Sequence, residues 1–154
     1  MLFGDKDNNL ADARMEQVFE AIKEHDKNAV RAIFSQKAIT EADNFDAGVD
    51  FLLSFVTGEV VSWSRDESPV VSDVVENSRK TKQLLTWYTL ETEEHKYLVF
   101  LVDYPIDTVN PENEGLYSLR IIREEDEENL VGTMEEWIIP GIYVLDDFQL
   151  KALQ

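Results

Sequence analysis

Residues 97–106 read Tyr-Leu-Val-Phe-Leu-Val-Asp-Tyr-Pro-Ile, and residues 115–123 read Gly-Leu-Tyr-Ser-Leu-Arg-Ile-Ile-Arg. Both segments are rich in β-branched and aromatic residues, which favour strands, and turn residues bound them. Residues 98–102 are apolar without a break, whereas a strand with one face in water would alternate apolar and polar side chains. The pattern therefore predicts a central strand that is covered on both faces, with residues 115–123 as its neighbour.

Further strands are predicted on both sides of this pair. They cover residues 60–64, 68–75, 80–91 and 137–144. Pro69 marks the start or the edge of its strand, because proline has no N–H to donate. The polar residues 92–95 form a hairpin loop into the central strand, and the turn residues of segment 107–114 form a second loop. The acidic run at 124–128 is predicted to be a solvated turn or short helix.

Helices are predicted before the strands. Apolar residues recur at helical spacing over residues 10–24, at Ala11, Met15, Val18, Phe19 and Ile22. Asp26 is suited to cap a second helix, and Asp43 or Asn44 a third, which ends near Gly58. One more turn is expected around Ala38 and Ile39.

The order of these elements defines the fold class, which is α+β. We predict three N-terminal helices packed on the concave side of a curved, mostly antiparallel sheet of five to six strands. Residues 1–9 are expected to be a polar tail, residues 10–146 one domain, and residues 147–154 a C-terminal tail.

Composition excludes several classes of function. Lys and Arg number 14 and Asp and Glu 32, which gives a net charge of −18 and argues against nucleic acid as a partner. The chain has no Cys, so thiol nucleophiles and thiolate zinc sites are excluded. No apolar run approaches the ~20 residues that span a bilayer, and no leader sequence is recognised.

No cofactor and no metal site is predicted. The two histidines, His25 and His95, have no ligand at helical spacing, which argues against zinc. Asp5, Asp7, Asn9 and Glu16 match positions 1, 3, 5 and 12 of a calcium loop. However, Leu10 stands where that loop needs a glycine, so a polar tail is the preferred interpretation.

Several segments resemble one family. They are Ala-Ile-Lys-Glu-His-Asp-Lys-Asn-Ala-Val-Arg-Ala-Ile-Phe-Ser (21–35), Phe45-Asp46, Asp-Thr-Val-Asn-Pro-Glu-Asn-Glu-Gly-Leu-Tyr-Ser-Leu-Arg-Ile-Ile (107–122), Trp137 and Pro140-Gly141-Ile142-Tyr143. The order of elements resembles the cone-shaped fold of the nuclear transport factor 2 superfamily. The segments resemble a family of uncharacterised lipoproteins of Gram-positive gut bacteria within it. The resemblance implies a cell-surface location through a lipid-bearing Cys upstream, with the cytoplasm as the alternative, and it implies no activity.

A pocket at the open end of the cone is the predicted site. Its expected lining is Trp63, Trp87, Tyr88, Asp103, Tyr104, Ser118, Arg120 and Trp137. Ser118 and Arg120 should point the same way by the period of two. Some enzymes of the superfamily use a buried carboxylate as base, and Asp103 is the candidate for that role. The preferred interpretation is that Asp103 pairs with Arg120 or faces water, because buried charges usually occur in pairs.

The sequence is compatible with three functions. The preferred one is a non-catalytic, surface-attached domain that binds a small ligand or a protein partner. The second is a lyase or isomerase with Asp103 as base and a small apolar substrate. The third is a structural module that dimerises, because apolar residues on both faces of the strands require cover on the outer face. Membrane contact is expected only through the lipid anchor.

Overall fold

Strand β4 (Lys96–Asp107) lies in the middle of a six-stranded sheet in a computed structural model that describes residues 3–145, with side chains from Lys6 onward. Its neighbours β3 (Arg79–Thr92) and β5 (Gly115–Arg123) both run antiparallel to it. Tyr97 to Asp103 are all buried. The prediction of a central strand covered on both faces is therefore confirmed.

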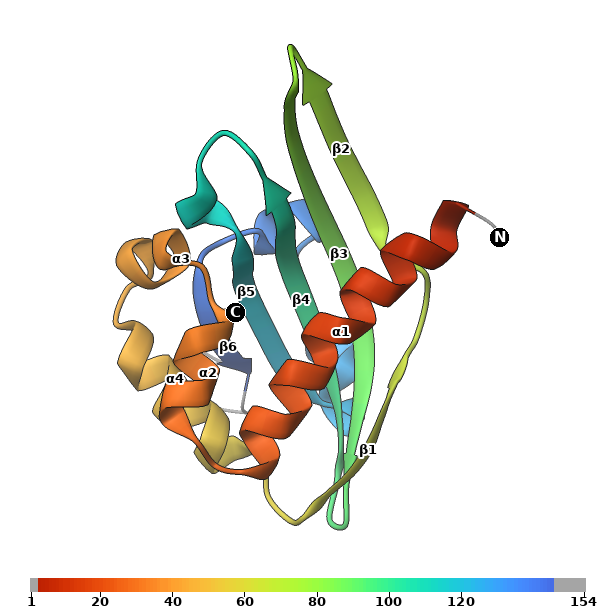
Figure 1. The fold of residues 1–154 in the computed structure, drawn as a ribbon. Coiled ribbons are helices and arrows are strands. Elements are labelled where there is room, and N and C mark those ends of the chain that lie inside the picture. The colour runs from red at the N-terminus through yellow and green to blue at the C-terminus, as the bar shows by residue number, and fades with distance from the viewer. Residues whose placement is uncertain (1–2, 146–154) are drawn as a thin grey trace.

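The other three strands complete the sheet (Figure 1). Strands β1 (Val60–Arg65) and β2 (Val70–Glu76) share one edge of β3, where β1 pairs with the end near Thr92 and β2 with the end near Arg79. Strand β6 (Gly141–Leu145) pairs with β5 in parallel. The predicted α+β class with a mostly antiparallel sheet is confirmed.

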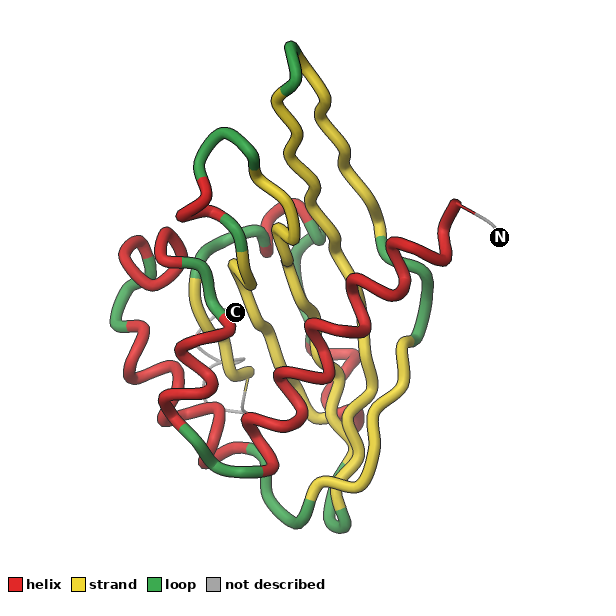
Figure 2. The backbone as a smooth tube through the Cα atoms, viewed as in Figure 1, coloured by secondary structure: helices red, strands yellow, loops and turns green. Residues whose placement is uncertain are grey.

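Four α-helices cover the inner face of the sheet, as Figures 1 and 2 show. They are α1 (Phe3–Lys23), α2 (Lys27–Ile33), α3 (Gln36–Glu41) and α4 (Phe45–Phe55). The side chains of Asp26, Ser35 and Asn44 accept hydrogen bonds from the first turns of α2, α3 and α4. Helix α3 is the extra turn expected around Ala38, and α1, α2 and α4 are the three predicted helices.

Helix α1 begins at Phe3, so it includes residues 3–9, which are most of the predicted polar tail. The reason is tertiary. Asp7 forms an ion pair with Lys82 on β3, and this contact holds the first turns of the helix on the sheet. Residues 5–16, which match some positions of a calcium loop, are helical and therefore do not form such a loop. The predicted C-terminal tail, residues 147–154, lies outside the described residues.

The main core lies between the helices and the inner face of the sheet. Its largest fully buried members include Met15, Leu52, Tyr88, Leu90, Tyr97, Leu101, Leu119 and Ile121. The hydroxyl of Tyr97 donates to the carbonyl oxygen of Phe55 at 3.2 Å, which ties β4 to the end of α4.

The outer face of the sheet is covered by the chain's own crossover between β5 and β6. This crossover contains the 3-10 helices η2 (Glu124–Asn129) and η3 (Glu135–Trp137). Leu85, Phe100, Val102 and Trp137 form a buried outer cluster, with Leu130 and Met134 packed against it. The predicted strand at 137–144 begins only at Gly141, which has a φ of +116°, because Trp137 turns inward to fill this cluster.

Candidate functional site

The eight residues predicted to line one pocket lie on two opposite faces of the sheet. Trp63, Tyr88 and Asp103 belong to the inner face under α1. Trp87, Tyr104, Ser118, Arg120 and Trp137 belong to the outer face. Successive side chains of a strand point to opposite faces, so the adjacent pairs Trp87–Tyr88 and Asp103–Tyr104 are separated by the sheet itself. The structure therefore does not bring the eight together.

Asp103 is bound by helix α1. Its Oδ1 accepts a hydrogen bond from Nε of Arg14 at 2.9 Å, and its side chain is only 4% exposed. Its second oxygen, Oδ2, is buried and has no hydrogen-bond partner among the described residues. Burial raises the pKa of Asp103, and the opposing effect of the Arg14 guanidinium does not cancel that increase.

Further polar contacts join α1 to β1 and β3. Oδ1 of Asp12 accepts from the hydroxyl of Tyr88 at 3.0 Å and from Nε of Arg65 at 3.3 Å. The indole N–H of Trp63 donates to Glu16 at 2.7 Å. Burial and the hydrogen bond to Asp12 raise the pKa of Tyr88, which keeps it a neutral donor. These contacts fix the middle of α1 on β1 and β3.

Arg120 is enclosed by aromatic rings rather than by a carboxylate. Its guanidinium carbon lies 5.2 Å from the ring centre of Trp137 and 5.3 Å from that of Tyr143. Nε of Arg120 and Oγ of Ser118 are both buried without a hydrogen-bond partner in the described part of the chain. Burial lowers the pKa of Arg120. Ser118 and Arg120 do share a face, as predicted, but it is the face away from Asp103, so the two charged groups do not pair.

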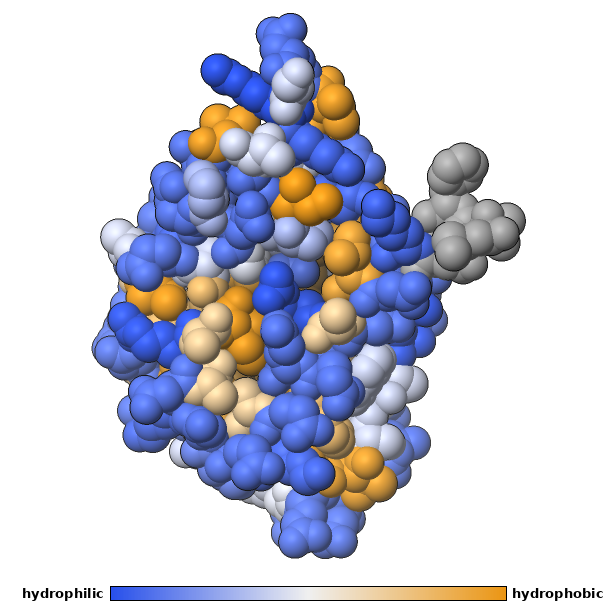
Figure 3. Space-filling model, in the orientation of Figure 1, coloured by the Kyte–Doolittle hydropathy of each residue, from blue (hydrophilic) through white to orange (hydrophobic). Residues whose placement is uncertain are grey.

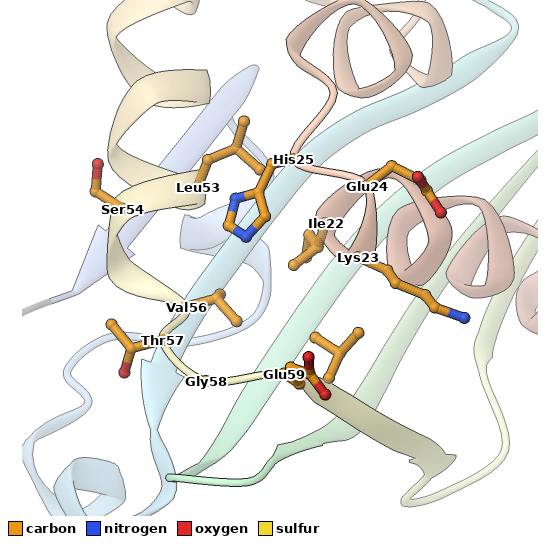
Figure 4. A pocket seen from close by; sticks show the side chains of 11 residues that line it. Ile22, Lys23, Glu24, His25, Leu53, Ser54, Val56, Thr57, Gly58 and Glu59 are labelled. Atoms are coloured by element: carbon orange, nitrogen blue, oxygen red, sulfur yellow. The ribbon is translucent and has the colours of Figure 1, made fainter.

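A cleft of about 750 Å³ opens at the end of the molecule where α1 and α4 both finish (Figure 4). Ile22, Leu53, Val56 and Val60 form its apolar walls, and its polar lining includes Thr57 and Glu59. The imidazole of His25 projects into the space between the end of α1 and α4, whereas Lys23 and Ser54 point outward. We call this the basal cleft.

The backbone explains why His25 reaches the basal cleft. His25 follows the last turn of α1 with a φ of +51°, and its N–H donates to the carbonyl of Ile22. Gly58, with a φ of +83°, turns the opposite wall from α4 into β1. The sequence pattern predicts that His25 and Gly58 follow helix ends, but it does not predict that they line one cleft. The two turns lie far apart in the chain, and only the packing of α1 beside α4 unites them.

Residues 3–145 contain neither a cluster of metal-binding side chains nor a membrane-spanning helix. No three His, Asp or Glu side chains of this part lie close enough to hold a metal ion. None of its helices combines the length and the apolarity that a bilayer crossing needs.

Comparison with known proteins gives one family. The family model described as "Domain of unknown function (DUF5104)" matches residues 17–124, which extend from the middle of α1 to the first residue of η2. No curated protein matches the chain.

Proposed function

We propose that this chain, which belongs to the DUF5104 family, is a non-catalytic binding domain that takes a small ligand in its basal cleft. The observation that carries the proposal is the cleft itself. Its volume of about 750 Å³ falls in the range of small-molecule sites, and its lining combines apolar walls with a few polar groups.

The lining suggests the class of ligand. The walls formed by Ile22, Leu53 and Val56 suit an apolar body, and His25 and Thr57 offer hydrogen bonds to a polar head group. His25 and Glu59 come from different loops, so one ligand can bridge the end of α1 and the start of β1. We therefore expect a metabolite with an apolar body and one hydrogen-bonding end.

The test is a ligand screen by thermal shift on the purified chain, followed by NMR. A ligand at 100-fold its Kd should add about 2.7 kcal/mol to the free energy of unfolding. The chain has only two histidines, and only His25 lines the cleft. A cleft ligand should therefore shift the ring-proton signal of His25 and leave that of His95 in place.

Matched variants separate binding from folding. His25→Asn removes the imidazole but keeps a residue that tolerates the left-handed backbone, and His95→Asn is its control. We expect the first to weaken binding about tenfold, the loss of about one hydrogen bond, and the second to leave binding unchanged. Equal binding by both variants, or no ligand across a broad metabolite panel, contradicts the proposal.

Catalysis by Asp103 is the second candidate, and one observation favours it: Oδ2 is buried and has no hydrogen-bond partner among the described residues. A lyase or isomerase would use that oxygen to take a proton from an apolar substrate. Against this stands Arg14, which already holds Oδ1 at 2.9 Å. Chemical conversion of a bound ligand that Asp103→Asn abolishes would establish the enzyme, whereas unchanged ligand recovered from the complex supports the binding domain.

Membership in the nuclear transport factor 2 superfamily and attachment to the cell surface also belong to this proposal. Helices followed by a curved, mostly antiparallel sheet support the superfamily. A lipid-bearing Cys would have to precede Met1 in the native protein. Detection of the protein in the detergent phase after extraction of source cells would support the anchor, and recovery in the cytoplasmic fraction would contradict it.

The structural module was proposed because the outer face needs cover. The crossover between β5 and β6 supplies cover at Phe100 and Val102 within one chain. A dimer is therefore not needed to bury that part of the sheet, and we rank this function below the other two.

A further inference from the structure

We infer that a groove on the outer face of the sheet binds an organic cation with an apolar body. The groove has a volume of about 350 Å³ and lies between the end of β1, strands β3 and β4, and the crossover. We call it the outer groove. It is separate from the basal cleft, so this inference does not depend on the function proposed above.

The floor of the outer groove is apolar. Leu85, Trp87 and Leu98 form it from β3 and β4, and Leu130 and Met134 of the crossover close one side. The ring of Trp87 packs on Phe100 and Trp137, with ring centres 5.0 Å and 5.7 Å apart, so it is held in place. A fixed aromatic wall favours a flat or aliphatic ligand body and also attracts a cation through its π face.

The rim of the outer groove is acidic. Asp66, Glu67 and Glu127 line it, and among the described residues no Lys, Arg or His does. Glu127 belongs to η2, a short helix whose sequence is Glu-Glu-Asp-Glu-Glu-Asn. Asp66 is fixed in place, because its Oδ1 accepts from the hydroxyl of Thr89 at 2.8 Å. The local field therefore favours a positive charge at the mouth.

Size and charge together select the occupant. A volume of about 350 Å³ suits a small molecule and sits at the lower end of ligand sites. A second copy of the chain would bring the same acidic rim and another net charge of −18 to this surface, which disfavours self-association here. A small ammonium compound with an aromatic or alkyl body satisfies both the floor and the rim.

The experiment uses three probes with nearly the same body: 2-phenylethylammonium, neutral 2-phenylethanol and anionic phenylacetate. Binding is followed by NMR through the indole N–H signals of the three tryptophans. Trp63 lies on the inner face, hydrogen-bonded to Glu16, and serves as the internal control. We expect the cation to shift the Trp87 signal, to bind at least threefold tighter than the alcohol, and to bind more weakly at high salt.

A charge-matched pair of variants isolates the rim. Glu67→Gln with Glu127→Gln removes two rim carboxylates, and Glu20→Gln with Glu93→Gln removes two exposed carboxylates elsewhere. Both double variants carry the same net charge. The rim variant should lose about three- to tenfold in affinity for the cation, because exposed ion pairs are each worth up to about 1 kcal/mol.

Four results would overturn the inference. The first is equal affinity for the cation and the alcohol. The second is an equal loss of affinity in the two double variants, which would indicate only the overall charge. The third is movement of the Trp63 signal in place of the Trp87 signal. Dimerisation of the free chain that protects Trp87, measured by sedimentation, would assign the outer groove to a second copy instead.

Discussion

Asp103 is a carboxylate whose two oxygens have different surroundings. Oδ1 is bound to Arg14, and Oδ2 is buried and receives no hydrogen bond from the described residues. Burial therefore raises the pKa of Asp103 above the value of the unfolded chain, despite the neighbouring guanidinium. The folded protein then holds this proton to a higher pH than the unfolded chain does. Between the two pKa values, the contribution of Asp103 to the free energy of unfolding falls as the pH rises.

Asp103→Asn is expected to remove that pH dependence. Asparagine does not titrate, so the free energy of unfolding of the variant minus that of the wild type should increase as the pH rises from 4 toward 8. For one proton the slope is at most about 1.4 kcal/mol per pH unit. Urea denaturation at several pH values measures it.

Asp107 should change the pH dependence of the free energy of unfolding in the opposite direction in the same experiment. Burial acts to raise its pKa, but the backbone N–H of Asn110 and the amide of Asn113 lower it below the usual value. The stability from Asp107 is present above the unfolded pKa and is lost as the pH falls. For Asp107→Asn the same difference should therefore decrease on going from acid to neutral pH. Parallel curves for the two variants would contradict at least one of the two assignments.

Helix α1 depends on polar contacts as much as on its apolar stripe. Asp12 accepts hydrogen bonds from Tyr88 and Arg65, so Asp12→Ala leaves the buried hydroxyl of Tyr88 without its partner. An unsatisfied buried group of this kind costs about 1–3 kcal/mol, and we expect Asp12→Ala to destabilise the protein by about 2 kcal/mol.

A double-mutant cycle tests the cause. Tyr88→Phe removes the hydroxyl, so adding it to Asp12→Ala should restore about 1 kcal/mol relative to the sum of the single changes. Asp50→Ala is the control, because Asp50 pairs with Lys27 in an exposed ion pair and its loss should cost less than about 1 kcal/mol. Strict additivity in chemical denaturation would show that Tyr88 does not depend on Asp12.

Strand β2 is more exposed than any other strand of the sheet. All seven of its residues are exposed, including Val74 and Val75 at 56% and 70%, and it pairs only with β3. The β2–β3 hairpin projects beyond the rest of the sheet in Figure 1, and Figure 3 shows apolar side chains at this projecting end among mainly hydrophilic ones.

Amide hydrogen exchange should therefore differ strongly between two strands of one sheet. Few buried contacts hold β2, so its amides should exchange through local opening, while those of β4 at Val99–Val102 should exchange only on global unfolding. Added denaturant should accelerate exchange in β4 and hardly affect β2. Exchange of β2 at the rate of β4 would show that its exposed edge is protected by a partner.

At the scale of the whole molecule, the crossover between β5 and β6 acts as a lid on the outer face. Trp137 is its main contact, because the ring packs on Trp87 and Phe100 and under Arg120. Trp137→Ala should lower the free energy of unfolding by about 3 kcal/mol and increase the binding of an apolar dye. Val131→Ala, an exposed position of the same crossover, should change stability by less than about 0.5 kcal/mol.

Periodicity was enough to predict the order of strands and helices, because a stretch such as Leu98–Val102 has no stable place except the centre of a sheet. It was not enough to predict the site. Arg120 lies opposite Phe100, and alternation along β4 puts Phe100 on the other face from Asp103; this register between two strands is a long-range pairing that the pattern within each strand does not give. The partner of Asp103, Arg14, lies outside the apolar stripe of α1, and helical periodicity does not indicate that it reaches a residue 89 positions further along the chain.

The parallel pairing of β6 has a consequence for synthesis on the ribosome. Helix α4 packs on this last strand so closely that a Cβ on Gly48 would lie 3.0 Å from Ile142. A nascent chain that has emerged from the ribosome only as far as Arg123 therefore contains α4 but not yet β6, the strand on which α4 packs. We expect such truncated chains to need protection by a chaperone until the closing strand emerges from the exit tunnel.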